Sequence, residues 1–170
     1  IALILLTGLM VVFLGSWKVG LLSMIPNLTP ILITLGLMGF FDLPLDPFTI
    51  LIGSIGIGLV VDDTVHFLSV FQRYFDRYGD AARAIQETLM TTGRALLFTT
   101  LILVGGFASY MAADFVNIFA FGMLLVVCIG SALILDVLAA PALMMLVYGK
   151  QSSLKQPRAY QKEIGFAELN

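Results

Sequence analysis

Three ionisable residues lie close together inside a long apolar stretch and are the clearest candidates for chemistry. Asp62 and Asp63 are adjacent, and His66, the only histidine of the chain, follows Asp62 by four residues. Residues four apart share one face of a helix, so Asp62 and His66 could exchange a proton. Desolvation and repulsion both disfavour a doubly charged carboxyl pair, so we expect Asp62 and Asp63 to titrate as a unit. The pattern predicts a proton-relay site.

The helix that must carry these residues sets their depth. At 1.5 Å per residue, Asp62 lies about 21 Å from Phe48, where the apolar stretch begins, and Asp63 lies about 15 Å from Arg73. Both carboxyls therefore fall near the centre of a bilayer core about 30 Å thick. An ionised aspartate there costs about 2.5–3.5 kcal/mol. This cost favours a functional role for the pair over a purely structural one.

Small and polar residues continue from this site along the same helix face toward Arg73. Such a face is costly against lipid, so we expect it to meet other helices or a water-filled path. The alternative is structural, because a buried aspartate can simply hydrogen-bond to a neighbouring helix. The stripe consists of Ser54, Gly58, Asp62, His66, Ser69 and Arg73.

Three polar residues in later apolar stretches could join the site. Thr99 and Thr100 lie within the fourth stretch, where either hydroxyl could reach a carboxyl. A bond from each hydroxyl to a carbonyl of its own helix is at least equally expected. Asp136 lies in the last stretch at a depth comparable with Asp63, and both a relay role and a structural role stay open for it.

The elements that position these residues are five apolar stretches, at residues 1–14, 19–41, 48–71, 95–113 and 115–148. The chain is 59% hydrophobic and 12% charged, about half the charge of an ordinary soluble domain. Because about 20 residues cross a bilayer core, these stretches predict an all-α membrane protein with a bundle of about five transmembrane helices.

The two end stretches depart from the length of one span. Residues 1–14 are too short, lack an initiating Met and have no basic region before them, so we expect a helix cut partway and a piece of a longer protein. Residues 115–148 would form about 50 Å of helix, and we expect the membrane part to give way to an interfacial turn at Pro141. The polar tail, 149–170, is expected to be weakly ordered.

The charged residues predict the topology. Threading the five stretches back and forth places all nine Lys and Arg residues on one side, and Asp42, Asp46 and Asp114 on the other. Under the positive-inside rule the basic side, with the carboxyl terminus, is cytoplasmic. The single cysteine, Cys128, excludes a disulfide framework, and no basic cluster indicates nucleic-acid binding. We expect no metal or organic cofactor, with protons as the coupling ion.

The block Gly56 to Phe67, GIGLVVDDTVHF, resembles the intramembrane motif of the resistance–nodulation–division (RND) superfamily. Within it, the chain is most similar to hydrophobic-substrate exporters related to the mycobacterial membrane protein large (MMPL) family. Residues 26–39, 84–100 and 135–143 resemble the neighbouring family segments, so the resemblance covers about residues 1–148. There is one departure. In many drug-exporting relatives the acidic pair belongs to the first half and the second half contributes a basic residue, whereas this chain has Asp63 and no mid-membrane Lys.

The resemblance implies a secondary transporter rather than an enzyme. Such exporters have twelve helices in two similar halves, and this chain would be the five-helix run of the carboxyl-terminal half. Carried over by position, Asp62 and Asp63 are relay carboxyls and Thr99 is a relay hydroxyl for proton antiport. The implied partners are membrane lipids, the other half, two large extracytoplasmic domains and a hydrophobic or lipid-like substrate, in a bacterial inner membrane. A homo-oligomer is left open.

Two other classes of function remain as alternatives. A sterol-sensing-type bundle without transport shares the five-helix architecture. An intramembrane aspartyl protease would also carry aspartates on two spans, here Asp62 or Asp63 with Asp136. That class is remote, because its Gly-x-Gly-Asp motif is absent: Leu-Val-Val separates Gly58 from Asp62.

Overall fold

A computed structural model of the chain describes residues 7–8, 11, 17–44 and 46–155, and every regular element in this part is helical. This result confirms the predicted all-α membrane bundle. The elements are α2 (Trp17–Leu22), α3 (Met24–Phe40), α4 (Pro47–Tyr78), α5 (Ala81–Thr88), the π-helical turn η1 (Leu89–Gly93), α6 (Arg94–Ala108), the 3-10 turn η2 (Ser109–Ala112) and α7 (Val116–Lys155).

Three helical segments are long and apolar enough to cross a membrane: Pro47–Tyr78, Ala81–Ala112 and Val116–Gly149. The second joins α5, η1, α6 and η2 end to end. A fourth apolar helix, α3, is shorter at 17 residues. The predicted stretch 1–14 lies almost entirely outside the described residues.

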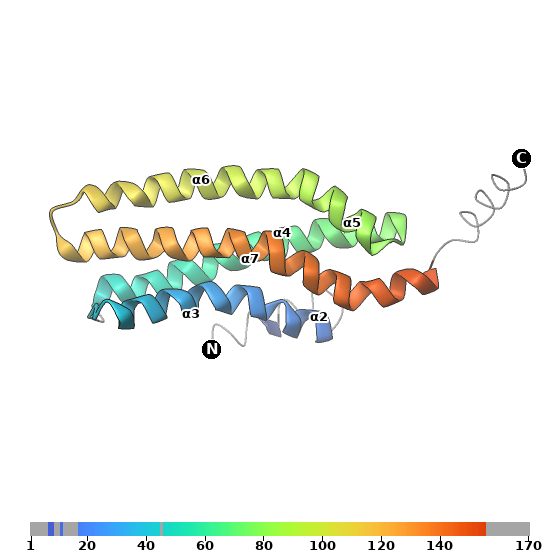
Figure 1. Cartoon of the computed structure of the whole chain (residues 1–170), viewed down its shortest axis with the longest axis horizontal. Coiled ribbons are helices and arrows are strands. Elements are labelled where there is room, and N and C mark those ends of the chain that lie inside the picture. The colour runs from blue at the N-terminus through green and yellow to red at the C-terminus, as the bar shows by residue number, and fades with distance from the viewer. Residues whose placement is uncertain (1–6, 9–10, 12–16, 45, 156–170) are drawn as a thin grey trace, which may run out of the picture.

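The helices lie side by side along the long axis of the molecule, with α3 and α6 running opposite to α4 and α7 (Figure 1). Helix α7 packs against α3, α4, α5 and α6 and so occupies the middle of the bundle. The turns from α3 to α4 and from η2 to α7 lie at one end, and α2 and the turn from α4 to α5 lie at the other (Figure 1). The predicted acidic loops therefore lie at the end opposite the arginines near the turn from α4 to α5, and the basic residues of the tail beyond residue 155 lie outside the described residues.

Local signals at both ends of α4 fix its length. The Asp46 carboxylate accepts a hydrogen bond from the Thr49 amide at 2.7 Å, and the Asp46 amide donates to the Thr49 hydroxyl at 2.8 Å. This reciprocal pair is a capping box that satisfies two exposed amides. At the other end Gly79 adopts φ 66°, a left-handed conformation that glycine tolerates, and its amide donates to the Phe75 carbonyl at 2.8 Å.

The capped helix has 32 residues, seven more at its basic end than the predicted stretch 48–71. The polar segment stays helical because Phe75 is buried in a core cluster with α5 and α7. Asp62 and Asp63 therefore lie at the midpoint of a helix about 48 Å long.

Aromatic contacts set how α4 and α7 align along their length. Near the basic end, the rings of Phe71 and Phe75 lie 5.4 and 4.8 Å from that of Tyr148. Near the acidic end, the rings of Phe48 and Phe121 lie 6.3 Å apart. Because contacts at both ends hold the two parallel helices, the residues between them meet in a defined register.

The interfacial turn expected at Pro141 was wrong. Helix α7 continues through Pro141, and its membrane-length apolar segment extends to Gly149. A proline inside a helix removes one backbone hydrogen bond. Here Ala140 and Met144 on either side of it are buried in the core cluster, and this packing supports the continued helix. Residues 149–155 of the predicted tail are helical, and the rest of the tail lies outside the described residues.

Candidate functional site

A cavity of about 320 Å³ between α4, α6 and α7 brings together three of the predicted relay residues. Asp62 and Asp63 line it from α4. Thr99, 36 residues after Asp63 in the sequence, lines it from α6. The remaining wall is apolar and consists of Leu59, Val60, Ile102, Leu103, Ile129 and Ala132. A few convergent polar groups in an apolar hollow are the usual make-up of a binding or relay site.

The two carboxyls of the pair have different surroundings, because consecutive helical residues point about 100° apart. Asp62 is exposed, whereas Asp63 is half-buried. Asp63 is close enough to Asp62, His66 and Asp136 to interact electrostatically with all three. Asp63 is thus the carboxyl that links the cavity to the interior of the bundle.

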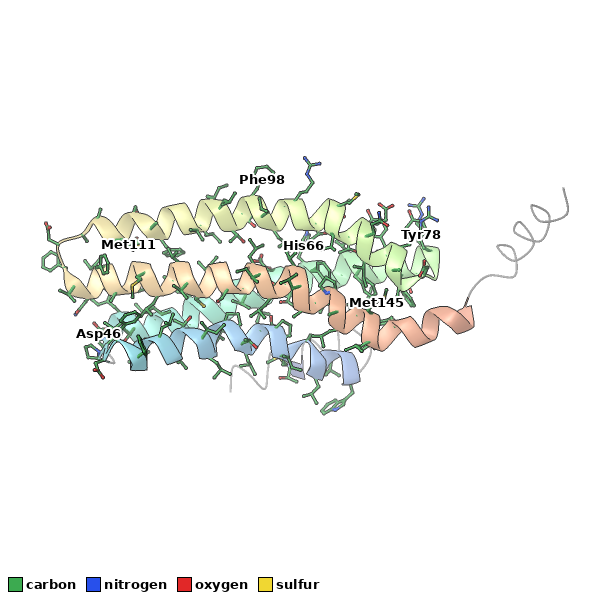
Figure 2. The ribbon with its side chains drawn as sticks, viewed as in Figure 1. Asp46, His66, Tyr78, Phe98, Met111 and Met145 are labelled. Carbon is green, nitrogen blue, oxygen red and sulfur yellow. The ribbon has the colours of Figure 1, made fainter. Side chains whose placement is uncertain are left out.

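His66 is exposed and is not among the residues that line the cavity. Figure 2 shows it beyond the middle of the bundle, toward the end where Tyr78 lies. Five of the six residues of the predicted stripe are nevertheless exposed, Ser54, Gly58, Asp62, His66 and Arg73, and the sixth, Ser69, is partly buried. The described helices leave this face of α4 uncovered.

Thr99 and Thr100 have separate roles in the packing. Thr99 lines the cavity, and its hydroxyl is placed to donate to carbonyls of its own helix, at 3.0 Å to Leu96 and 3.2 Å to Ala95. A hydroxyl that donates in this way can still accept a hydrogen bond from a group in the cavity. Thr100 is buried away from the cavity, and its hydroxyl has no hydrogen-bond partner among the described residues.

A second polar cluster, Asn27, Thr64 and Asp136, lies inside the bundle and was not predicted as a unit. The Thr64 hydroxyl lies 2.6 Å from Asn27 Oδ1 and 2.8 Å from Asp136 Oδ1. The three side chains come from α3, α4 and α7, and none is more than 2% exposed. The sequence carried a signal for it, because an amide such as Asn27 is costly in an apolar stretch unless it is paired.

This Asn27–Thr64–Asp136 cluster settles the depth of Asp136. Thr64 is the residue after Asp63, so a direct contact places Asp136 at the level of the carboxyl pair, in the middle of α4. The hydrogen bonds also join three helices, which is the structural role that the sequence left open. Among the described residues, no group of three or more His, Cys, Asp or Glu side chains could hold a metal ion.

Comparison with known proteins finds one similar protein but no matching family model or solved structure. The chain is 28% identical over 145 residues to a protein of Methanocaldococcus jannaschii named "Putative membrane protein MJ1562". The match covers 83% of this chain and 37% of the relative, so the chain spans little more than a third of that protein. This similarity agrees with the three membrane-length helices, and the chain is a helical bundle of a membrane protein.

Proposed function

We propose that the chain is the carboxyl-terminal transmembrane half of an RND-type, MMPL-like exporter that uses the proton-motive force to move hydrophobic or lipid-like substrates. Asp62, Asp63 and Thr99 form its proton relay, with His66 on the adjoining face. The observation that supports this proposal is the shared cavity, in which two mid-helix carboxyls meet a hydroxyl from a neighbouring helix.

The relay works by changing the charge inside the cavity. A proton that enters binds a carboxylate of the pair and removes a charge that the apolar wall disfavours. Thr99 accepts or donates a hydrogen bond as the carboxyl changes state. One charge crossing 100 mV contributes about 2.3 kcal/mol, a ~50-fold shift in a two-state equilibrium, which suffices to bias a rearrangement of packed helices.

The uncovered face of α4 supports a larger assembly. Asp62 and His66 are exposed on it, and an ionisable side chain directly against lipid is strongly disfavoured. In the proposed exporter the other transmembrane half covers this face, and the substrate path runs through the extracytoplasmic domains. This face would then also give the relay its route toward the basic end at Arg73.

The proposed orientation places the basic end in the cytoplasm and the bundle in the inner (plasma) membrane. Arg73, Arg77 and Arg83 lie near the turn from α4 to α5, whereas Asp42 and Asp114 lie at the opposite end. An excess of Lys and Arg on short loops marks the cytoplasmic side.

Gradient-driven lipid movement in vesicles tests the proposal. The full-length protein is reconstituted into phospholipid vesicles with a fluorescently labelled phospholipid, and a pH gradient is imposed. We expect movement that depends on the gradient and falls at least tenfold in Asp62→Asn or Asp63→Asn. Asp114→Asn makes the same chemical change at an exposed loop and should behave as wild type.

Two results would overturn the proposal. Undiminished movement in both relay variants removes the relay role, and gradient-independent binding of the lipid without movement favours a sterol-sensing-type sensor. The geometry does not favour an aspartyl protease, because Asp136 bonds to Thr64 inside the bundle and does not line the cavity with the carboxyl pair.

A further inference from the structure

The Asn27–Thr64–Asp136 cluster is incompletely satisfied although it is buried. Asp136 is 1% exposed and Asn27 is 2% exposed, yet Asp136 Oδ2 and Asn27 Nδ2 have no hydrogen-bond partner among the described residues. Buried polar atoms are nearly always paired, and unpaired ones in a folded protein often mark function. Cross-linking three helices does not require these spare atoms.

The hydrogens of the cluster can be counted. The Thr64 hydroxyl has one hydrogen, but three oxygens lie within reach: Asn27 Oδ1 at 2.6 Å, Asp136 Oδ1 at 2.8 Å and the Val60 carbonyl at 3.1 Å. If Asp136 were ionised, one of the two short contacts would join two lone pairs. A protonated Asp136 that donates to Thr64, while Thr64 donates to Asn27, places one hydrogen in each short contact.

A reversed Asn27 amide would supply the second hydrogen in another way. Amide orientation is assigned from the hydrogen-bond network, so Nδ2 could instead donate to Thr64 and leave Thr64 to donate to a charged Asp136. That arrangement leaves an ionised carboxyl buried in the bundle, with Oδ2 unpaired among the described residues. The like-charged Asp63 also acts on Asp136 and disfavours a second negative charge there. The protonated state is therefore the one that the burial and the charges favour.

The cluster lies one helical turn along α4 and α7 from residues that line the cavity. Val60, four residues before Thr64, and Ala132, four residues before Asp136, both line the cavity. Residues four apart are one helical turn apart, so the two sites are about 6 Å apart along these helices. Asp63 belongs to the cavity and interacts with Asp136, so it connects them.

We propose that Asp136 is an inner proton-holding carboxyl that exchanges its proton with Asp63 and is positioned by Thr64 and Asn27. This inference rests on the proposed relay and adds a third carboxyl to it, on α7. Asp136 is a relay group, whereas Thr64 and Asn27 are positioning residues.

The exchange conserves charge and hydrogens. The proton leaves the Asp136 carboxyl and binds the Asp63 carboxylate, so that Asp136 becomes negative and Asp63 neutral. The Thr64 hydroxyl then turns its hydrogen from Asn27 Oδ1 to Asp136 Oδ1. Because Asn27 lies on α3, this turn removes a hydrogen bond between α3 and α4 and strengthens one between α4 and α7, which couples proton transfer to helix packing.

Infrared difference spectroscopy on the full-length protein in vesicles tests the inference. The carbonyl stretch of a protonated carboxyl is recorded between acidic and alkaline pH. We expect Asp136→Asn to remove one band of a buried carboxyl, and Thr64→Val to shift that band because its hydrogen-bond partner is lost. Ser131→Ala is the control, since Ser131 lies on α7 and its hydroxyl donates to Cys128 of the same helix.

Lipid movement in the same vesicles separates a relay role from a structural one. Asparagine at 136 keeps an oxygen that can accept from Thr64, so a purely structural Asp136 predicts normal movement in Asp136→Asn. We expect at least a tenfold loss. Full movement, or a carboxyl band that persists in Asp136→Asn, overturns the inference. If this variant does not fold, an unshifted band in Thr64→Val has the same meaning.

Failure of the inference can be told from failure of the proposed function. If Asp62→Asn and Asp63→Asn both leave lipid movement unchanged, the relay proposal fails whatever the infrared bands show. If those variants lose movement while Asp136→Asn keeps both movement and band, only the role of Asp136 fails.

Discussion

Replacing Thr64 by valine removes one hydroxyl from the centre of the bundle and nearly preserves side-chain shape. Thr64 is 0% exposed, and its hydroxyl contacts Asn27 on α3 and Asp136 on α7. The substitution therefore deletes both interhelical hydrogen bonds at once and leaves an amide and a carboxyl without their common partner. We expect the bundle to lose stability mainly at the packing of α4 against its neighbours.

The magnitude follows from the number of bonds lost. Hydrogen bonds between membrane helices contribute about 0.6 kcal/mol on average and up to about 1.7 kcal/mol, so two contribute about 1–3 kcal/mol. Leaving Asn27 and Asp136 partly unsatisfied acts in the same direction. Thr64→Ser keeps the hydroxyl and loses only a methyl group, so it should cost about 1 kcal/mol or less.

The measurement is the free energy of unfolding of the full-length protein in mixed micelles, from titration with a denaturing detergent. Thr88→Val is the matched control. Thr88 is also 0% exposed, but its hydroxyl donates to the Ala84 carbonyl of its own helix at 2.7 Å. A bond within one helix contributes little to tertiary packing, so this variant should stay within about 0.5 kcal/mol of wild type. Equal losses in Thr64→Val and Thr88→Val would refute the reasoning.

Two further predictions concern packing and access to the cavity. A Cβ on Gly122 would lie 2.7 Å from the Phe107 carbonyl oxygen, whereas one on Gly130 of the same helix meets nothing within 4 Å. Gly122→Ala should therefore lower the thermal unfolding temperature in detergent and Gly130→Ala should not; equal stability of the two would contradict the close approach of α6 and α7. In a variant whose native cysteine is replaced by alanine, Thr99→Cys should react with a water-soluble thiol reagent, because Thr99 lines the cavity. Leu97→Cys, on the other face of α6, should stay unlabelled, and equal labelling would mean that the cavity gives no special access.

The carboxyl pair could be predicted as a candidate site because the energetic cost of placing two aspartates deep in an apolar stretch can be judged from the sequence alone. An apolar stretch of known length fixes how far Asp62 and Asp63 lie from water, and a 3.6-residue period fixes which residues share their face. The structure brings Thr99 to the same cavity. The sequence left Thr99 and Thr100 equally able to reach a carboxyl, and only the family resemblance singled out Thr99, since nothing in the spacing says which faces of two helices meet.

The second cluster could not be predicted because it depends on tertiary register. Thr64 and Asp136 are 72 residues apart, and they meet because ring contacts near both ends of α4 and α7 align these helices. The turn expected at Pro141 was wrong for a similar reason. Burial of its neighbours outweighs the lost backbone hydrogen bond and keeps α7 helical, and that burial is visible only in the folded bundle.

Proton movement through the cavity is the most direct test of the central claim. Vesicles that contain the full-length protein and a trapped pH-sensitive dye are given a pH gradient, and proton flux is recorded with and without the labelled phospholipid. The relay predicts lipid-dependent flux in wild type and in Asp114→Asn, and its loss when Asp62 and Asp63 are both replaced by asparagine. Unchanged flux in that double variant would contradict the claim that these carboxyls carry the proton.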